Sequence, residues 1–395
     1  MLALLATLLL AGAIFVWKAQ ESAAHNATAA PAGTAGATPS LALAASGAAS
    51  NAASRTAEQT KHDQLQALKE QLVAAQQRLS SYQAATRYPP ESRPISEHGD
   101  QIKPFNPIVD VQPLRNAQGD AIPGRHLLTH QDRVYVSGQE SALFTVQMQD
   151  DQGHAAPLRV MRATTHEVQD ATHTQTVSQM AVQFEDRGAN GDALAGDGIY
   201  SARLQPAAQG FANTQGTIRV DLDLQSNTGG SAHAFFDIIY TPTVPATWSG
   251  AISESVDGGS LTFHLGADVR EAGRYVINAR VYDASGKPFA LLEFNDELPT
   301  GHAEVPLTLF GKLIRDAKPV FPLTLRDLQG FVLYENRFPD RAMMPRRPQA
   351  IYTSGVYPPA GFSDAEWSSP DRQRHLDEYT RDVTQLQQTL RPLQP

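Results

Sequence analysis

The chain has 395 residues, a formal net charge of −9 and a pI near 5.7, with 41% hydrophobic and 18% charged residues. This length allows two or three domains. The acidic balance argues against nucleic acid as a partner, because phosphate binding needs a basic face. Cysteine is absent, which excludes disulfides, thiolate catalysis, cysteine-ligated zinc and a lipoprotein anchor.

An unbroken apolar run, MLALLATLLLAGAIFVW, opens the chain and ends before Lys18. As a helix it would rise about 25 Å, close to the roughly 30 Å core of a bilayer. Residues 1–18 are therefore predicted to be an inner-membrane signal anchor or a cleaved signal peptide, with the cleavage site at Ser22–Ala24. The charges of Lys18 and Glu21 favour the anchor. Both interpretations predict a periplasmic or cell-surface location, tethered or secreted.

Residues 19–59 follow as a tract of alanine, serine, threonine, glycine and proline, without aromatic residues and with few charges. Such a composition cannot build a core, so it predicts a disordered tether. A flexible coil of about 40 residues would separate its ends by roughly 35 Å. The tether would let the folded part stand off the membrane.

Two helices with apolar seams are predicted to bracket the folded part, over residues 60–88 and 369–391. The first seam is Leu65, Leu68, Leu72, Ala75, Leu79 and Tyr82, and the second is Leu376, Tyr379, Val383, Leu386 and Leu390. Both repeat at alternating spacings of three and four, the pattern of a coiled coil or of a helix packed on a neighbour. The helices could therefore pair with each other, lie on a domain, or form a homo-oligomer through the heptad seams.

The period changes to two between the helices, which predicts strands. The first set is 133–136, 142–148, 180–184, 199–204, 217–224 and 233–240, and the second is 260–269, 273–283, 289–295, 303–311, 320–328 and 330–336. We predict two tandem Ig-like antiparallel β-sandwiches, at 105–242 and 243–338. The proline-rich residues 339–368 are predicted to be irregular.

The stretch EDRGANGDALAGDGIYS, residues 185–201, carries the sharpest chemical pattern in the chain. Asp186, Asn190, Asp192 and Asp197 could supply side-chain oxygens to calcium, which takes six to eight oxygen ligands. The spacing is not that of an EF-hand, because no glutamate closes a twelve-residue loop. The alternative is a hairpin turn whose side chains cap their own backbone.

The phrase NGDALAGDGIY within this stretch resembles a turn of bacterial secreted or envelope Ig-like modules of the choice-of-anchor type, with the pattern N-G-D-x-x-A-G-D-G-x-Y. GRYVINARVYDASGKP, residues 273–288, is similar to a strand pair of the same modules. The resemblance implies an extracytoplasmic β-sandwich for display or binding. It carries over no catalytic residue.

No other motif indicates a reaction. His166, Glu167, Asp170 and His173 lack the H-E-x-x-H spacing of a zinc helix, and we interpret them as surface residues. No nucleophile elbow, P-loop or dinucleotide-binding glycine motif is present.

The sequence therefore predicts a non-catalytic, envelope-tethered scaffold or adhesion protein that holds another envelope or surface macromolecule. A polysaccharide-binding accessory module is the alternative, with Trp248 and Trp367 as the candidate aromatic residues. An enzyme of unrecognised type is the second alternative. The sequence predicts no cofactor apart from calcium at the acidic stretch.

Overall fold

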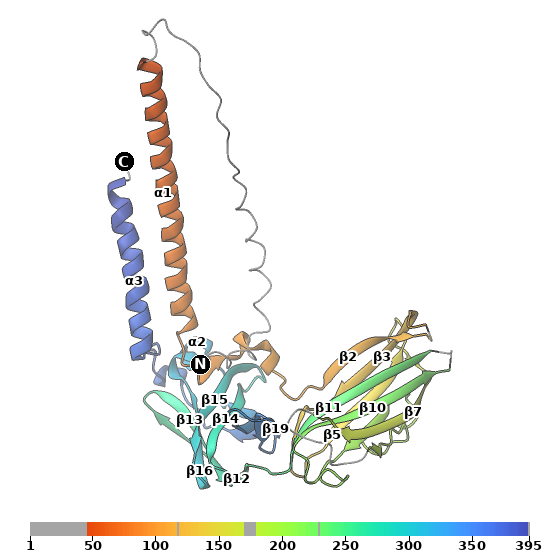
Figure 1. The fold of residues 1–395 in the computed structure, drawn as a ribbon. Helices are drawn as coiled ribbons and strands as arrows, with labels where there is room; N and C mark the ends of the chain where they lie inside the picture. The colour runs from red at the N-terminus through yellow and green to blue at the C-terminus, as the bar shows by residue number, and fades with distance from the viewer. Residues whose placement is uncertain (1–45, 117, 170–178, 228–229, 394–395) are drawn as a thin grey trace, which may run out of the picture. The chain divides into compact units, whose positions relative to one another are not determined.

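The computed structural model describes residues 46–116, 118–169, 179–227 and 230–393, with side chains from residue 59 onward. The predicted anchor, residues 1–18, and most of the predicted tether lie outside the described residues. No helix in the described part of the chain is both long and apolar enough to cross a membrane. The described fold is mainly β, with several antiparallel sheets and few helices (Figure 1).

The first helix, α1 (Ser46–Ala85), is longer than predicted. It begins inside the segment predicted to be a disordered tether, so that prediction is wrong for residues 46–59. The physical reason is the alanine content of this segment, because alanine has the highest intrinsic helix propensity. Composition without aromatic residues excluded a core, but it did not exclude a helix.

The second long helix, α3 (Pro370–Leu390), begins as the sequence predicts. Ser369 is its N-cap, and its side chain accepts a hydrogen bond from the Arg372 backbone nitrogen at 3.1 Å. Proline at the first helical position has no amide hydrogen to leave unpaired. Cap and proline together fix the start of the helix.

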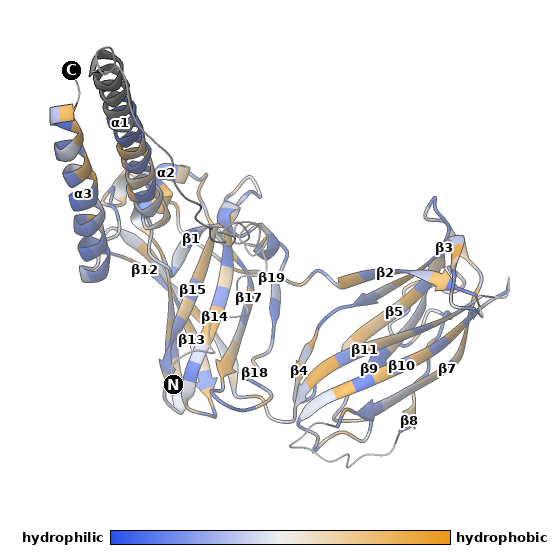
Figure 2. Ribbon diagram, turned by 45° about the horizontal axis from the view of Figure 1, so that its top comes forward, coloured by the Kyte–Doolittle hydropathy of each residue, from blue (hydrophilic) through white to orange (hydrophobic). Residues whose placement is uncertain are grey.

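The C-terminal part of α1, from residue 70 onward, lies beside α3 (Figures 1 and 2), and the two seams meet at Tyr82. The Tyr82 ring lies edge-on against His375 at 5.7 Å and Tyr379 at 5.3 Å between centroids. Ala75 and Val383 are buried on the two seams. The two predicted seams thus contact each other at the base of the helix pair.

The first sandwich contains a sheet that curls around its own core. Its strands are β2 (Ile108–Arg115), β3 (Ala121–Gln131), β4 (Tyr135–Ser137), β5 (Ala142–Gln149), β6 (Ala155–Ala156), β7 (Leu158–Glu167), β8 (Met180–Ala181), β9 (Tyr200–Leu204), β10 (Gly216–Ser226) and β11 (Ser231–Thr241). The order is β6-β5-β3-β2-β11-β10-β7-β8, with β9 beside β5 and β4 beside β11. Phe144 of β5 stacks on Phe236 of β11 at 4.7 Å between centroids, so the two halves of the sheet face each other.

Alternation in β10 sets the inner face of this sandwich. Ile218, Val220, Leu222 and Leu224 are all buried, as the period of two predicts. β10 pairs with β11 over its whole length and with β7 on its other side. It is therefore a central strand, and its four apolar side chains lie in the core.

The second sandwich has two sheets over one core. Its strands are β1 (Ser92–Pro94), β12 (Ala246–Asp257), β13 (Ser260–Val269), β14 (Gly273–Tyr282), β15 (Pro288–Leu298), β16 (Gly301–Leu309), β17 (Thr324–Leu333), β18 (Arg341–Met343) and β19 (Arg347–Thr353), with the short helix α2 (Gly311–Ala317). One sheet runs β1-β15-β14-β17-β18, with β19 also on β17, and the other runs β12-β13-β16. Side chains from both sheets share one apolar cluster.

This second sandwich is not confined to residues 243–338. β1 precedes the whole first sandwich, yet Arg93 of β1 pairs with Leu291 of β15. β18 and β19 lie in residues 339–368, which were predicted to be irregular, so that prediction is wrong for 341–343 and 347–353. Pairing with β17 supplies the order that the proline-rich sequence did not indicate. The first sandwich is thus inserted into the second.

Three short 3-10 helices, η1 (Ile95–Glu97), η2 (Gly99–Gln101) and η3 (Pro359–Gly361), complete the second sandwich, and η4 (Arg391–Leu393) follows α3. Arg280 of β14 holds η2 in place. It is fully buried, and its guanidinium donates to the backbone oxygen of Gln101 at 2.8 Å and to the side-chain oxygen of Gln101 at 2.6 Å. The segment before the first sandwich is therefore fixed to the core strand of the second.

Candidate functional site

The acidic stretch forms a loop between β8 and β9 of the first sandwich. Strand β8 is shorter than the predicted strand 180–184, and the chain continues as a loop to Tyr200. An isolated bridge between Glu185 and Ser201 closes the loop at its base. Because β9 pairs with β5, the loop is held next to β5.

Three of the four predicted ligands come together in this loop. Oxygen atoms of Asp186, Asp192 and Asp197 all lie within 4.8 Å of one another. Asp192 is buried, with 8% of its surface exposed, and the other two are half-buried. Asn190 behaves differently, because its side-chain nitrogen donates to the Gln183 backbone oxygen at 3.2 Å.

Backbone amides hold each carboxylate in position. Asp186 accepts hydrogen bonds from the backbone nitrogens of Gly196, Asp197 and Gly198, at 2.6, 3.2 and 3.0 Å. Asp192 accepts from Gly188 at 2.5 Å, and Asp197 accepts from Ile199 at 2.9 Å. These hydrogen bonds are the ones predicted for a turn whose Asp side chains cap their own backbone. The loop therefore has the predicted turn structure.

Glycine is required at one point of the loop. Gly191 has a φ of 96°, and a Cβ atom there would lie 2.3 Å from the Leu143 Cδ1 atom of β5. A larger residue would meet both backbone strain and a steric clash. The glycine lets the turn pack closely on β5 and so keeps the three carboxylates together.

The cluster could hold a metal ion in addition to forming a turn. Three carboxylates this close repel one another, and a cation between them would relieve that repulsion. Each carboxylate oxygen has two lone pairs, so an amide bond leaves room for a ligand bond. The three side chains supply part of the oxygen set that calcium takes, and backbone oxygens or water would supply the rest.

The described part of the stretch 166–173, which contains His166 and Glu167, does not form a metal site. His166 Nδ1 lies 3.2 Å from Asp221 Oδ2 on the neighbouring strand β10, and Glu167 is buried at 6% exposure. Asp170 and His173 lie outside the described residues. Within the described part, His166 therefore faces a carboxylate across the sheet, and the prediction that Glu167 is a surface residue is wrong.

The two candidate aromatic residues differ in their environment. Trp248 donates from its indole nitrogen to the Pro345 backbone oxygen at 2.8 Å, and it packs against the second core. Trp367 instead lines a hollow at the base of the helix pair. Trp248 therefore has a structural role, and Trp367 is the better candidate for contact with a ligand.

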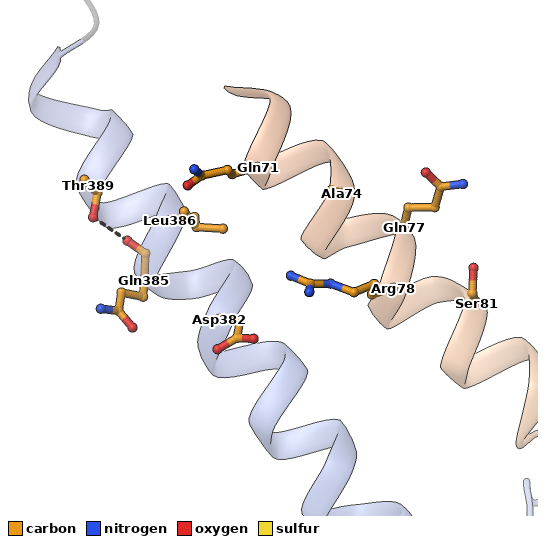
Figure 3. Close-up of a pocket in the computed structure, with 9 residues that line it drawn as sticks. All are labelled: Gln71, Ala74, Gln77, Arg78, Ser81, Asp382, Gln385, Leu386 and Thr389. Atoms are coloured by element: carbon orange, nitrogen blue, oxygen red, sulfur yellow. Dashed lines mark hydrogen bonds between the residues drawn. The ribbon is translucent and has the colours of Figure 1, made fainter. Parts of the chain in front are cut away.

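Sequence reasoning missed the hollows beside the helix pair, because they depend on how the helices pack. One hollow of about 830 Å³ lies between the C-terminal halves of α1 and α3, with Ala74 and Arg78 on one side and Asp382 and Leu386 on the other (Figure 3). Seven of its nine lining residues are of polar types. The heptad spacing predicted the seam, and the flanking positions that form this hollow carried no motif.

Comparison with known proteins gives little further information. No family model matches the sequence, and no curated protein matches it. A DUF4785 family protein from Legionella pneumophila is similar in structure at a TM-score of 0.39 and 12% identity, over 59% of this chain and 58% of that one. The Yersinia pseudotuberculosis adhesin InvE is similar at a TM-score of 0.17 and 12% identity, over 56% and 58%. The chain spans under two thirds of each, and neither likeness carries an argument about function.

Proposed function

We propose that the protein is a non-catalytic, envelope-tethered scaffold that binds another surface or envelope macromolecule through its β-sheets. The observation that supports this most directly is strand β2 of the first sandwich. Ile108, Val109 and Val111 of this strand are 52%, 51% and 59% exposed. Large aliphatic side chains at this density on one strand indicate an interaction surface.

The backbone of β2 is also open to a partner. β2 pairs with β3 from Ile108 onward, whereas on its other side the described residues pair with it only at Arg115, opposite Ser231. An unpaired strand edge offers amide and carbonyl groups to an additional strand. Asp110 and Pro113 on this strand are the residue types that limit uncontrolled pairing, which favours a specific partner over aggregation.

The non-catalytic part of the proposal rests on how shifted titratable groups are used. Burial, and then a hydrogen bond to Asp316, raises the pKa of Tyr88 to about 12. Burial lowers the pKa of Arg280 to about 10. Both groups hold elements of the fold together. Tyr88 also lines a hollow at the base of the helix pair, but an enzyme would be favoured by several perturbed groups that converge on one cleft.

A photo-crosslinking amino acid at position 111 tests the proposed surface in intact cells. We expect a discrete crosslinked species from Val111 and none from Val320, an equally exposed aliphatic residue of the second sandwich at 57%. Equal crosslinking from both positions, or none from Val111, would contradict the proposal. Protease added to spheroplasts tests the location, and we expect it to degrade the folded part.

We further propose that the loop of Asp186, Asp192 and Asp197 binds calcium. Its support is the approach of the three carboxylates within 4.8 Å. Binding to the folded state alone would stabilise it by about 2.7 kcal/mol at a hundredfold excess over Kd. Millimolar calcium should raise the melting temperature, magnesium should not, and Asp192→Asn should remove the effect. An unchanged melting temperature would leave the loop as a turn alone.

A further inference from the structure

A second hollow, of about 710 Å³, lies at the base of the helix pair, where α1 ends and α3 begins. Tyr82 and His375 contribute from the two helices, and Trp367 from the segment before α3. Arg93 and Glu97 close it from the β1–η1 segment. Figure 1 shows the ends of both helices reaching the second sandwich beside α2.

The walls of this hollow are held rigidly. Arg93 donates to the Ala85 backbone oxygen at 2.7 Å and to Glu97 at 3.0 Å. Arg372, which is 7% exposed, donates to the Thr86 hydroxyl at 3.0 Å. The Trp367 backbone nitrogen donates to the Arg87 oxygen at 3.1 Å. A ligand would therefore meet a preformed site, with little ordering cost.

Two aromatic residues in the wall keep free polar groups. Tyr82 packs its ring against His375 and Tyr379, but its hydroxyl makes no hydrogen bond within the described residues. The Trp367 indole nitrogen likewise has no hydrogen-bond partner in the described part of the chain. Tyrosine and tryptophan that combine an apolar ring with an unused donor are typical of ligand-contact positions.

The charges around the hollow cancel in pairs. Arg93 lies 3.0 Å from Glu97, Arg372 lies 2.8 Å from Glu366, and Arg374 lies 3.1 Å from Asp371. A phosphate or carboxylate ligand would have to displace one of these carboxylates, and a cationic ligand would have to displace a guanidinium. The hollow is therefore suited to a ligand without net charge.

We propose that this hollow binds a neutral saccharide. A pyranose ring offers a face of C–H groups, which packs on the electron-rich face of an aromatic ring. Its hydroxyls can both donate and accept, so they match the Tyr82 hydroxyl, the Trp367 indole and the outer atoms of the Arg93–Glu97 pair. The inference rests on this hollow alone, and it stands whether or not β2 binds a partner.

Titration of the full-length protein with soluble neutral tetrasaccharides tests this proposal. Chitotetraose, cellotetraose and maltotetraose serve as probes, and tryptophan fluorescence and saturation-transfer NMR serve as readouts. We expect at least one probe to bind, and Trp367→Leu to weaken it about tenfold, a typical effect of about 1.4 kcal/mol. Trp248→Phe is the matched control and should leave the affinity unchanged.

Tyr82→Phe gives a second test that keeps the aromatic ring and the helix contact. We expect it to weaken binding several-fold without lowering the melting temperature. The proposal is overturned if none of the three probes binds at about 10 mM, an upper limit set by the weakest useful affinities. It is equally overturned if a probe binds and Trp367→Leu, with an unchanged melting temperature, does not weaken it. Crosslinking from position 111 reports on β2 separately.

Discussion

Replacement of Arg280 by methionine should strongly destabilise the second sandwich. Arg280 is fully buried and makes four hydrogen bonds: two to Gln101, one to the Asn278 side chain at 2.7 Å and one to the Asp327 backbone oxygen at 3.0 Å. None of these acceptors carries a formal charge. Methionine fills a similar volume but donates to none of these acceptors, which belong to half-buried residues; the Asn278 oxygen alone keeps a second donor, the Gln329 side-chain nitrogen at 3.0 Å.

The size of the effect follows from two opposed terms. Hydrogen bonds from a charged donor contribute about 1.5–3 kcal/mol each. Against them, burial lowers the pKa of Arg280 to about 10, which corresponds to a desolvation cost of about 3 kcal/mol for the charged form. Methionine avoids that cost. The lost hydrogen bonds outweigh this saving, and we therefore expect a net loss of about 3–5 kcal/mol.

Urea unfolding followed by tryptophan fluorescence measures this loss. The first sandwich, residues 105–242, contains no tryptophan, whereas Trp248 belongs to the second, so the signal reports on the correct core. At a slope of about 2–3 kcal/mol per M urea, the midpoint should fall by about 1–2 M. Arg274→Met is the control, because Arg274 lies on the same strand and is exposed. Equal midpoints for the two variants would refute the assigned role of Arg280.

Three further predictions concern other parts of the chain. The pKa of Tyr88 is raised to about 12, so the unfolded chain releases this phenol proton near pH 10 while the folded chain keeps it. The free energy of unfolding should therefore fall between pH 10 and 12, and it should fall less steeply in the Tyr88→Phe variant. Asp186→Ala removes the acceptor of three backbone amides and should lower the free energy of unfolding by about 2–3 kcal/mol, measured with urea in the absence of calcium. The control Asp257→Ala loses one such bond and should lower it by less than about 1 kcal/mol. Cysteines at Leu72 and Val383 should be joined within the monomer by a short bismaleimide, because these residues lie on the paired seams; crosslinking only between chains would indicate an oligomeric coiled coil.

Strands with a strict apolar alternation were predictable, and those without it were not. The predicted strand 260–269 has the bounds of β13, and 217–224 lies within β10. β2 was missed because Ile108, Val109 and Val111 are exposed and only Leu114 of this strand is buried, so the strand shows no apolar alternation. β12 was missed because its first residues follow a proline-rich run that resembles a linker.

Two predicted strands form a single strand. Residues 320–328 and 330–336 were predicted as separate strands with Gln329 between them, yet β17 runs from Thr324 to Leu333 through Gly330. A Cβ atom at Gly330 would lie 2.7 Å from the Ile277 side chain of β14. The glycine there provides space for packing, and only the tertiary structure distinguishes that role from a turn.

The candidate site was predictable only in part, because spacing along the chain shows which residues are near one another but not where their side chains turn. Three carboxylates within one loop must end close together, so Asp186, Asp192 and Asp197 could be found from spacing alone. The side chain of Asn190 turned to the Gln183 oxygen instead, which spacing does not reveal. The hollow at the helix base joins residues 82, 93, 367 and 375, and no local pattern connects positions so far apart in the chain.

The insertion of the first sandwich into the second also determines how the protein would carry tension. A pull applied between α1 and α3 passes through Tyr88, which bonds to Asp316 of α2, and through Arg372, which bonds to Thr86. That route crosses the base of the helix pair and the second sandwich, and it does not enter residues 105–242. While β1 stays paired with β15, the first sandwich is a side branch that bears no load. A partner bound to β2 would then be held by a domain that is mechanically shielded from forces between the chain's two helices.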